Sequence, residues 1–488
     1  MPDLRLSADD RALFSLVTEA TLANPFGERR ARLDAEMAAG AAQAPLQAAL
    51  ARVAERVTRL ESEGRARAAL YAEADRDLVF FTLLFDAFHR YLPAFDAHVA
   101  AQRERGDEPV TVPFAGEALA LLGRRGFSAE EARRFLGLFY QLRRAFFFID
   151  RSLVGRSASM RALRERLWRN LFSDDLRCYA RYLWNRMEDF STLLLGETGT
   201  GKGAAAIALG RSGFIPFDER RGAFVVSFTR SFVAINLSQY PETLIESELF
   251  GHRKGAFTGA IDHHEGVFAR CSPHGAIFLD EIGDVTIPIQ TKLLQVLQER
   301  TFSAVGSHEK QRFSGRVIAA TNRPLDLLRR EGRFRDDFYY RLCSDVIVVP
   351  PLRQRLAEDP AELALLLQHL VRRLAGEPVP ELVERVRGVF ARDLGRDYAW
   401  PGNVRELEQA VRHVLLEGRY LGDAAAVTAG WQERLTRGIE QGVIEAGALV
   451  CGYCALLYER HGTYEEVARR TGLDRRTVKA HVEAARRG

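Results

Sequence analysis

Two groups of charged side chains in the middle of the sequence each follow a short apolar run, a placement typical of catalytic groups on parallel sheets. The first run, STLLL, ends at Leu195 and leads into the loop GETGTGKG, after which a helical pattern begins. Glycines let the backbone N–H groups of such a loop point at phosphates, and the helix N-terminus also favours anions. The spacing predicts a phosphate-binding loop; a glycine-rich turn without a ligand is the alternative.

Within this loop, Lys202 is expected to reach the terminal phosphates of a nucleoside triphosphate. Gly203 stands where the general motif has Ser or Thr to hold Mg²⁺, so the metal must rely on other ligands. The residues predicted to contact the nucleotide are Gly196, Thr198, Gly199, Thr200, Gly201, Lys202 and Gly203.

The second group supplies those ligands. The apolar run Ala276 to Leu279 is followed by Asp280 and Glu281, which lie 78 and 79 residues after Lys202 with another strand pattern between them. We expect Asp280 to hold Mg²⁺ and Glu281 to polarise the attacking water, because the two carboxylates would meet the phosphate loop at the same edge of the sheet. An isolated Asp-Glu pair in a solvated turn is the alternative.

Three further polar residues follow in chain order. The run RVIAAT leads to Asn322, whose amide could sense the terminal phosphate through a water. Arg335 and Arg341 are spaced six residues apart in RFRDDFYYRL. Arginines stabilise charge on a phosphoryl group in transfer and can come from a neighbouring molecule, so we expect both to act in trans; surface salt bridges are the alternative.

A small apolar tip occurs between these groups, in ELFGHRKGAFTGAIDHHEG. It contains no acid, base or metal ligand, and its glycines bracket an aromatic residue. Loop tips carry binding residues, so this tip is predicted to contact a partner. Its residues are Gly255, Ala256, Phe257, Thr258, Gly259 and Ala260.

The elements that must position these groups alternate between short β-rich runs and helical patterns, which predicts a parallel sheet with crossover helices. The fold class expected for the 488 residues is multidomain. We predict a helical N-terminal regulatory domain (1–150), an α/β phosphate-loop subdomain with a parallel sheet (151–350), a helical lid (351–425) and a C-terminal helix-turn-helix domain (426–488). Phe80, Phe81, Phe85, Phe88 and Tyr91 are predicted as core of the first domain, with a ligand box or a subunit contact as alternatives.

Composition excludes several classes of protein. Apolar residues make up 47% and charged residues 27%, and the net charge is +4, so any DNA contact should come from a local basic patch. No apolar run approaches the ~18 residues that span a bilayer. The first residues show no signal peptide. We therefore expect a cytoplasmic protein without membrane contact. Five scattered cysteines argue against a disulfide framework, and Cys451 with Cys454 is interpreted as core packing, with metal or redox work as the alternative.

The chain ends in GTYEEVARRTGLDRRTVKAHVEAARR, which predicts two helices crossing at a tight turn. Asp474 is expected to cap the second helix. The residues expected to form the core are Val467, Leu473, Val478 and Val482. The residues expected to face outward and contact DNA are Arg475, Arg476, Lys479 and His481. A solvated helical hairpin is the alternative, and dimerisation would be needed to span two half-sites.

Six of these segments together resemble one known family. GETGTGKG, ESELFGHRKGAFTGA, AIFLDEIGD, AATNRPL, FRDDFYYRL and WPGNVRELE are similar to the bacterial sigma-54-dependent transcriptional activators, which are AAA+ ATPases also called enhancer-binding proteins. The match covers about residues 151–415, and the GAFTGA hexapeptide is specific to this family among AAA+ proteins. The C-terminal unit resembles the family's Fis-type domain.

The resemblance implies a role for each motif. GAFTGA would project from an ATPase ring, with Phe257 touching the sigma-54 factor of a closed promoter complex and Thr258 holding or moving the loop. Gly155 matches the segment that packs on adenine, and Asn236 the switch residue that couples Glu281 to the loop. Asn322 would be the first sensor, Arg335 and Arg341 the finger arginines, and Arg405 the second sensor.

On this resemblance we expect a regulator that binds an upstream enhancer, hydrolyses ATP with Mg²⁺ in a hexameric ring, and remodels sigma-54 RNA polymerase to open promoters. The family would be dimeric when inactive, and the N-terminal domain would receive an unknown signal or partner. Departures occur at Gly203, Leu237 and Ala269, and two extra stretches, 173–190 and 217–228, flank the phosphate loop. A non-hydrolysing DNA-binding regulator and an AAA+ machine acting on another protein remain the alternatives.

Overall fold

Five short apolar runs form one parallel sheet in the computed structural model, which describes residues 4–38, 45–395, 398–422, 435–436, 439 and 444–485. The strands are β1 (Thr192–Leu195), β4 (Phe232–Asn236), β5 (Ala276–Asp280), β8 (Arg316–Thr321) and β9 (Asp345–Val348). Their order across the sheet is β4-β5-β8-β1-β9, and every neighbouring pair is parallel. The predicted α/β core is confirmed, and the phosphate-loop strand β1 lies between β8 and β9.

The helices between these strands are crossovers, as the alternating pattern predicts. Between the phosphate loop and β5 these helices are α10 (Lys202–Gly210), η4 (Leu237–Gln239), α11 (Glu242–Phe250) and α12 (Val267–Arg270). After β5 come η5 (Ile282–Asp284), α13 (Ile287–Glu299), α14 (Leu325–Arg330) and α15 (Asp336–Leu342). Two hairpins complete this part, β2 (Phe217–Asp218) with β3 (Ala223–Phe224), and β6 (Thr301–Phe302) with β7 (Gln311–Arg312).

Alternate residues of each strand enter two different apolar cores. Leu193, Ile277 and Val317 pack with α11, α13 and α15 on one face of the sheet. Leu194, Phe278 and Ile318 belong instead to a core shared with the N-terminal helices. A strand directs successive side chains to opposite faces, so both faces of this sheet are covered.

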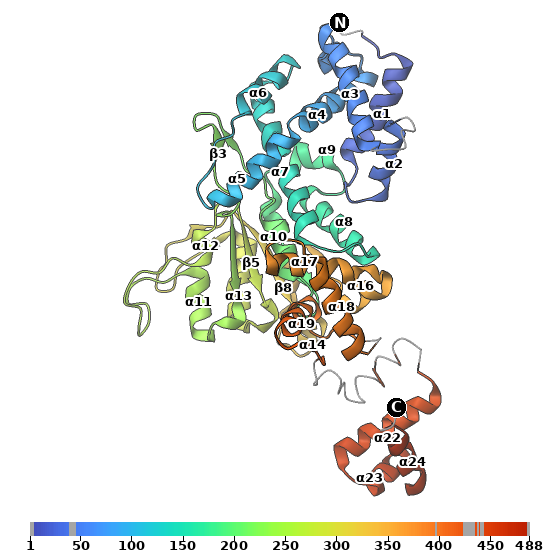
Figure 1. The fold of residues 1–488 in the computed structure, drawn as a ribbon. Coiled ribbons are helices and arrows are strands. Elements are labelled where there is room, and N and C mark those ends of the chain that lie inside the picture. The colour runs from blue at the N-terminus through green and yellow to red at the C-terminus, as the bar shows by residue number, and fades with distance from the viewer. Residues whose placement is uncertain are drawn as a thin grey trace. The chain divides into compact units, whose positions relative to one another are not determined.

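Helices fill the N-terminal part, as predicted, and in Figure 1 they gather as the blue and cyan ribbons beyond one end of the sheet. They are α1 (Ala8–Leu22), α2 (Glu28–Met37), α3 (Pro45–Ser62), η1 (Ala68–Leu70), α4 (Glu73–Arg90), α5 (Leu92–Arg105), α6 (Ala115–Arg124) and α7 (Ala129–Ser152). Ser128 and Glu131 form a capping box that begins α7. Among the described helices, none alone has the length and hydropathy to cross a membrane, although α4 and α5, which meet at a 51° bend, pass that measure as a pair.

The two extra stretches beside the phosphate loop pack against these N-terminal helices. Residues 173–190 follow α8 (Ala158–Phe172) and form α9 (Leu176–Cys178), η2 (Tyr179–Leu183) and η3 (Met187–Asp189). In the second stretch, Phe224 of β3 stacks on Tyr140 of α7 at 3.9 Å between ring centroids. The insertions therefore join the N-terminal helices to the α/β core, which explains why one apolar core continues across residue 150.

The chain divides into two compact units, Met1–Val379 with Gly402–Arg405, and Pro380–Pro401 with Glu406–Gly488. These units do not coincide with the four predicted segments. The expected lid is divided, since α16 (Leu352–Glu358) and α17 (Ala361–Ala375) belong to the first unit and α18 (Pro380–Asp393) to the second. Helix α19 (Asn403–Glu417) begins in the first unit. The predicted boundary at residues 425 and 426 lies outside the described residues.

The last helices, α22 (Ala446–His461), α23 (Tyr464–Thr471) and α24 (Arg475–Ala485), form a small three-helix unit. All four predicted core residues, Val467, Leu473, Val478 and Val482, pack together with Cys454 and Leu457 of α22. Gly472 ends α23 in the left-handed region at φ 71°, which permits the tight turn. The predicted helix-turn-helix geometry is present, with α22 as an additional supporting helix.

Candidate functional site

The phosphate loop connects β1 to α10, as the motif predicts. Gly199 and Gly201 have φ values of 80° and 108°, a region where other residues are strained. Lys202 is buried, and its Nζ donates to the carbonyl oxygens of Gly196 (2.8 Å) and Glu197 (3.1 Å). The lysine therefore folds back over its own loop, and burial lowers the pKa of its ammonium group. Phosphates would replace these carbonyls as partners of the charge.

The two acidic residues lie at the carboxyl end of β5. Burial raises the pKa of both Asp280 and Glu281. Glu281 adopts a left-handed backbone at φ 57°, which costs a non-glycine residue about 1–3 kcal/mol and marks a position that the surrounding structure imposes. Its buried Oε2 has no hydrogen-bond partner among the described residues. An unpartnered carboxylate oxygen of this kind can accept a hydrogen bond from a water molecule.

The side-chain amides of Asn236 and Asn322 lie at the ends of the two strands that flank β5, and each contacts a residue of this site. Asn322, after β8, donates from Nδ2 to Oγ1 of Thr198 in the phosphate loop at 2.8 Å. Asn236, at the end of β4, donates to Oδ2 of Asp280 at 3.4 Å. The structure therefore places Asn236 beside Asp280, the neighbour of Glu281, and its Oδ1 also accepts from the N–H of Ser238 at 3.0 Å.

Three residues that the sequence interpretation missed hold the phosphate loop. Asn403, fully buried, donates to the carbonyl of Thr198 at 3.1 Å and to Glu197 Oε2 at 3.2 Å. Glu197 also forms an ion pair with Arg353 at 2.5 Å. Asn403 lies in the segment WPGNVRELE, which carries part of the family resemblance, but that resemblance gives a role only to Arg405. Arg405 lies against the loop, because a Cβ on Gly199 would be 2.9 Å from its Cβ.

Gly155 lies at the entrance to α8, where side chains crowd it. A Cβ at this position would be 2.3 Å from Oε1 of Glu362 and 2.7 Å from Nη2 of Arg355. These two residues form a fully buried ion pair, and Glu362 also accepts from the backbone N–H of Arg156 at 2.7 Å. The segment predicted to pack on adenine is thus fixed by α16 and α17.

The protein oxygens at this site can bind Mg²⁺ only if phosphate oxygens of a nucleotide complete the coordination. No group of three or more His, Cys, Asp or Glu side chains that could hold a metal occurs in the described part of the chain. Asp280, at the end of β5, is the carboxylate ligand at hand, and Mg²⁺ commonly binds one or two carboxylates plus substrate phosphates. A Cβ on Gly203 would meet no atom within 4 Å, so the open space beside the loop is not filled by the protein.

The predicted finger arginines have partners away from the phosphate loop. Arg335 forms an ion pair with Asp337 of its own helix α15 at 2.6 Å. Arg341 donates from Nη2 to the carbonyl of Leu297, in α13, at 2.9 Å. Both guanidinium groups remain partly accessible at the surface, since Arg335 is half-buried and Arg341 is exposed.

The hexapeptide forms a closed turn. The N–H of Gly255 donates to the carbonyl of Ala260 at 2.8 Å. Phe257 at its tip is 36% exposed, and its ring lies edge-on to His252 at 4.9 Å. The base of the turn is tied to a neighbouring loop, where the N–H of Arg253 donates to the carbonyl of Val305 at 3.0 Å. The tip is therefore anchored at its base, while its aromatic ring remains accessible.

In the C-terminal unit, Asp474 caps α24 by accepting from the N–H groups of Arg476 (2.9 Å) and Thr477 (3.0 Å), as predicted. Arg475, Arg476 and Lys479 are exposed at the start of this helix. Arg475 also forms an ion pair with Glu465 at 2.9 Å.

The prediction that His481 faces outward is wrong. Its Nδ1 lies 3.1 Å from Sγ of Cys451 in α22. At helical spacing, position 481 lies next to the buried Val478 and Val482 and therefore faces the supporting helix. Of the two cysteines, Cys454 is fully buried in the core, as expected.

Comparison with known proteins finds one family model that matches the part of the chain containing this site. Residues 178–348 match the family model of the Sigma-54 interaction domain. The chain is 40% identical to the DNA-binding transcriptional regulator NtrC of Azospirillum brasilense, over 54% of this chain and 47% of that protein. It is 38% identical to the transcriptional regulatory protein ZraR of Salmonella typhimurium, over 60% of this chain and 63% of that protein.

Among solved structures, the NtrX structure from Brucella abortus in complex with ADP superposes with a TM-score of 0.42, at 20% identity, over 76% of this chain and 80% of that chain. The chain spans about half the length of the curated relatives that it matches. The matched region contains the acidic pair, the hexapeptide and the phosphate loop.

Proposed function

We propose, from the premise that this chain carries a sigma-54 interaction domain, that it is an ATP-dependent activator of transcription by sigma-54 RNA polymerase. The observation that carries the proposal is the hexapeptide turn. It is intact, it is closed by its own backbone hydrogen bond, and it presents an accessible aromatic ring in a chain that also has the phosphate-loop lysine and the acidic pair.

For ATP hydrolysis, we assign Lys202 to the terminal phosphates and Asp280 to Mg²⁺. Bound Mg²⁺ would neutralise developing charge on the phosphates. Glu281 would accept the proton of the attacking water, a role supported by its unpartnered buried oxygen. Asn322 would hold the loop through Thr198 in the position that a terminal phosphate requires.

We further propose that the active species is a ring, with hexamers as its expected form and dimers as the inactive one. Arg335 and Arg341 support this, since both are accessible and neither contacts the phosphate loop of its own chain among the described hydrogen bonds. In a ring, each would complete the site of a neighbouring subunit. The C-terminal unit would bind upstream DNA through Arg475, Arg476 and Lys479.

The N-terminal helices would then regulate the ATPase, and we place the protein in the bacterial cytoplasm, where sigma-54 polymerase works. This regulatory role is supported by the core that these helices share with one face of the sheet. A signal received there would act on the ATPase through direct packing, with no linker to cross.

The decisive experiment separates ATP turnover from the activation of sigma-54 transcription. Phe257→Ala should leave ATP hydrolysis near the wild-type rate, because the hexapeptide contains no acid, base or metal ligand. It should abolish the nucleotide-dependent complex with sigma-54 and open-complex formation, because a buried aromatic anchor often dominates an interface. Phe190→Ala is a matched control, since Phe190 is 40% exposed and lies outside the hexapeptide.

Phe190→Ala should retain both activities. Wild-type sigma-54 transcription by Phe257→Ala would remove the main support for an activator and favour a machine that acts on another protein. Absence of ATP hydrolysis in the wild-type protein would instead favour a DNA-binding regulator with an inactive ATPase.

A further inference from the structure

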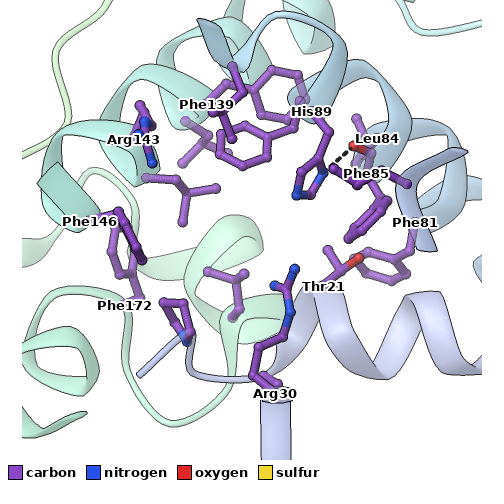
Figure 2. A pocket seen from close by; sticks show the side chains of 18 of the residues that line it. Thr21, Arg30, Phe81, Leu84, Phe85, His89, Phe139, Arg143, Phe146 and Phe172 are labelled. Carbon is purple, nitrogen blue, oxygen red and sulfur yellow. Dashed lines mark hydrogen bonds between the residues drawn. The ribbon is translucent and has the colours of Figure 1, made fainter. Parts of the chain in front are cut away.

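The N-terminal helices line an open cavity of about 500 Å³ that no part of the proposed ATPase mechanism uses. Aromatic side chains from α4, α7 and α8 form its wall, and Figure 2 shows several of them around the empty centre. They include Phe81, Phe85, Phe88, Phe139, Phe146 and Trp168. This volume lies within the range of ligand pockets, about 300–1,000 Å³.

One polar group in the wall is a neutral histidine. His89 points into the cavity, and its Nδ1 lies 2.9 Å from the carbonyl oxygen of Phe85 (Figure 2). A carbonyl only accepts hydrogen bonds, so Nδ1 carries the proton and Nε2 is left as an acceptor. Burial lowers the pKa of His89 to about 4, with a smaller contribution from the charges of Arg30 and Arg143, so the ring is uncharged at neutral pH.

The two arginines in the wall are already neutralised. Arg30 donates from Nε to Asp34 at 2.8 Å and from Nη1 to the carbonyl of Ala20 at 3.1 Å, which leaves Nη2 for another acceptor. Arg143 donates from Nη2 to Asp96 at 2.8 Å. Each positive charge therefore has one carboxylate. A charged ligand would lose its hydration in this cavity without gaining an unpaired countercharge, which is unfavourable.

Arg30 and His89 both pack on the ring of Phe85. The guanidinium carbon of Arg30 is 5.8 Å from the centroid of that ring, and the His89 ring centroid is 4.0 Å from it. A hydroxyl group could donate to Nε2 of His89 or accept from Nη2 of Arg30. Most of the remaining wall is apolar and suits a hydrocarbon body.

We propose that this cavity binds a neutral, largely apolar molecule that carries one hydrogen-bonding group, and that its occupancy is coupled to the phosphate loop. The coupling depends on the proposed nucleotide site. The proposal of a ligand site depends only on the cavity.

The physical connection begins at Tyr179, a fully buried residue of the cavity wall. Its hydroxyl lies 2.7 Å from Nε2 of Gln141 in α7, and the same nitrogen donates to the carbonyl of Ser212 at 3.0 Å. Ser212 follows the C-terminal end of α10, whose first residue is Lys202. One rigid helix therefore separates this bond from the phosphate loop.

Arg144 of helix α7 makes a second connection to the same end of α10. Arg144 donates to the carbonyls of Arg211 (2.7 Å) and Gly213 (2.6 Å), while Phe139, Arg143 and other residues of the same helix line the cavity. A ligand that shifts α7 or η2 would move the end of α10. Coupling of this kind is reciprocal, so a nucleotide at the loop must change ligand affinity by the same factor.

The binding test uses two fluorescent probes that differ in a single charged group. N-phenyl-1-naphthylamine is neutral and has one N–H donor, and 1-anilinonaphthalene-8-sulfonate adds a sulfonate to the same skeleton. Titration of the full chain should show one site for the neutral probe and at least tenfold weaker binding of the sulfonate. Equal or tighter binding of the sulfonate would overturn the neutral-ligand assignment.

Variants locate the site. Ala180→Phe and Leu142→Trp fill the cavity from two walls, and each should weaken the neutral probe at least tenfold while the protein keeps its wild-type helical circular dichroism. His89→Phe should weaken it about fivefold, the usual effect of one hydrogen bond. His369→Phe, the same change on the exposed side of α17, should have no effect. Unchanged binding in both filled variants would place the probe elsewhere and overturn the proposal.

The coupling test repeats the neutral-probe titration with saturating ADP, after calorimetry has shown that ADP binds. ADP should change the probe Kd at least fivefold, the lower end of typical coupling between sites. In Gln141→Leu, probe and ADP should each still bind, and the change in Kd should shrink. An unchanged probe Kd in wild-type protein that binds ADP would overturn the coupling. Failure of ADP to bind would instead contradict the proposed ATPase and leave the cavity site standing.

Discussion

The side-chain amide of Asn403 donates to the main-chain carbonyl of Thr198 at 3.1 Å, so a residue at the start of α19 holds the tip of the phosphate loop. Asn403 is fully buried and has a left-handed backbone at φ 55°. Asparagine tolerates this conformation better than most residues. Its Oδ1 also accepts from the N–H of Leu352 at 2.7 Å, so one side chain joins the loop to α16.

Asn403→Asp should weaken nucleotide binding. The aspartate keeps the acceptor for Leu352, but it loses the donor to Thr198 and places a negative charge beside Glu197. The lost hydrogen bond is worth about 0.5–1.5 kcal/mol and repulsion from Glu197 adds to the loss, so ADP affinity measured by calorimetry should fall about fivefold. Gln409→Glu makes the same chemical change at an exposed position of α19 and should leave affinity unchanged. Wild-type affinity in Asn403→Asp would show that the bond does not shape the loop.

Glu281→Gln should retain ATP binding and lose turnover, with the rate falling by ~10²–10⁴, the usual contribution of a positioned base. Lys202→Ala should lose binding itself. Steady-state hydrolysis and nucleotide binding, measured separately, distinguish the two effects. Asp284→Asn, a nearby acid paired with Arg323 at 2.9 Å, is the matched control and should remain active.

The pH profile provides an independent check of this assignment. Glu281 must be ionised to accept a proton, and burial raises its pKa. The rate should therefore fall, as pH is lowered, at a pH above the ordinary carboxylate range. Turnover at the wild-type rate in Glu281→Gln would remove this residue from the mechanism.

Arg335 should act across a subunit boundary. Arg335→Ala and Glu281→Gln should each be inactive alone, because a finger arginine supplied in trans contributes ~10³–10⁵ in kcat. Mixing the two proteins should restore part of the ATPase activity, since some interfaces in a mixed ring then combine an intact arginine with an intact base. Arg333→Ala, two residues earlier and paired with Glu331, should be active by itself. No recovery in rings shown to contain both inactive proteins would contradict a shared site.

The basic start of α24 should carry the affinity for DNA. Replacing Arg475, Arg476 and Lys479 by alanine should weaken binding and reduce the salt dependence by about one unit of slope for each phosphate interaction that the substitutions remove. Electrophoretic mobility or fluorescence anisotropy at several salt concentrations measures this slope. Alanines at Arg385, Arg387 and Arg392 remove the same charge from α18 and should leave the slope unchanged. Unaltered binding in the α24 variant would place DNA recognition elsewhere.

Local order along the chain determined much of the candidate site. Strand, loop and helix are consecutive at Gly196 to Lys202, and Asp280 ends its strand, so spacing alone places them at the carboxyl edge of a parallel sheet. The same holds for Val478 and Val482, whose spacing of four residues specifies the buried face of α24. In both cases the relevant neighbours are fixed by backbone geometry within a few residues.

Only the tertiary structure decided which buried faces meet. Asn403 reaches Thr198 across more than 200 residues of sequence, and His481 contacts Cys451 of α22. Hydrophobic periodicity reports that a face is buried but not what buries it, so the core shared by the N-terminal helices and the sheet could not be foreseen. The cavity beside His89 has the same origin, because a void is a property of several packed elements and leaves no pattern in any one of them.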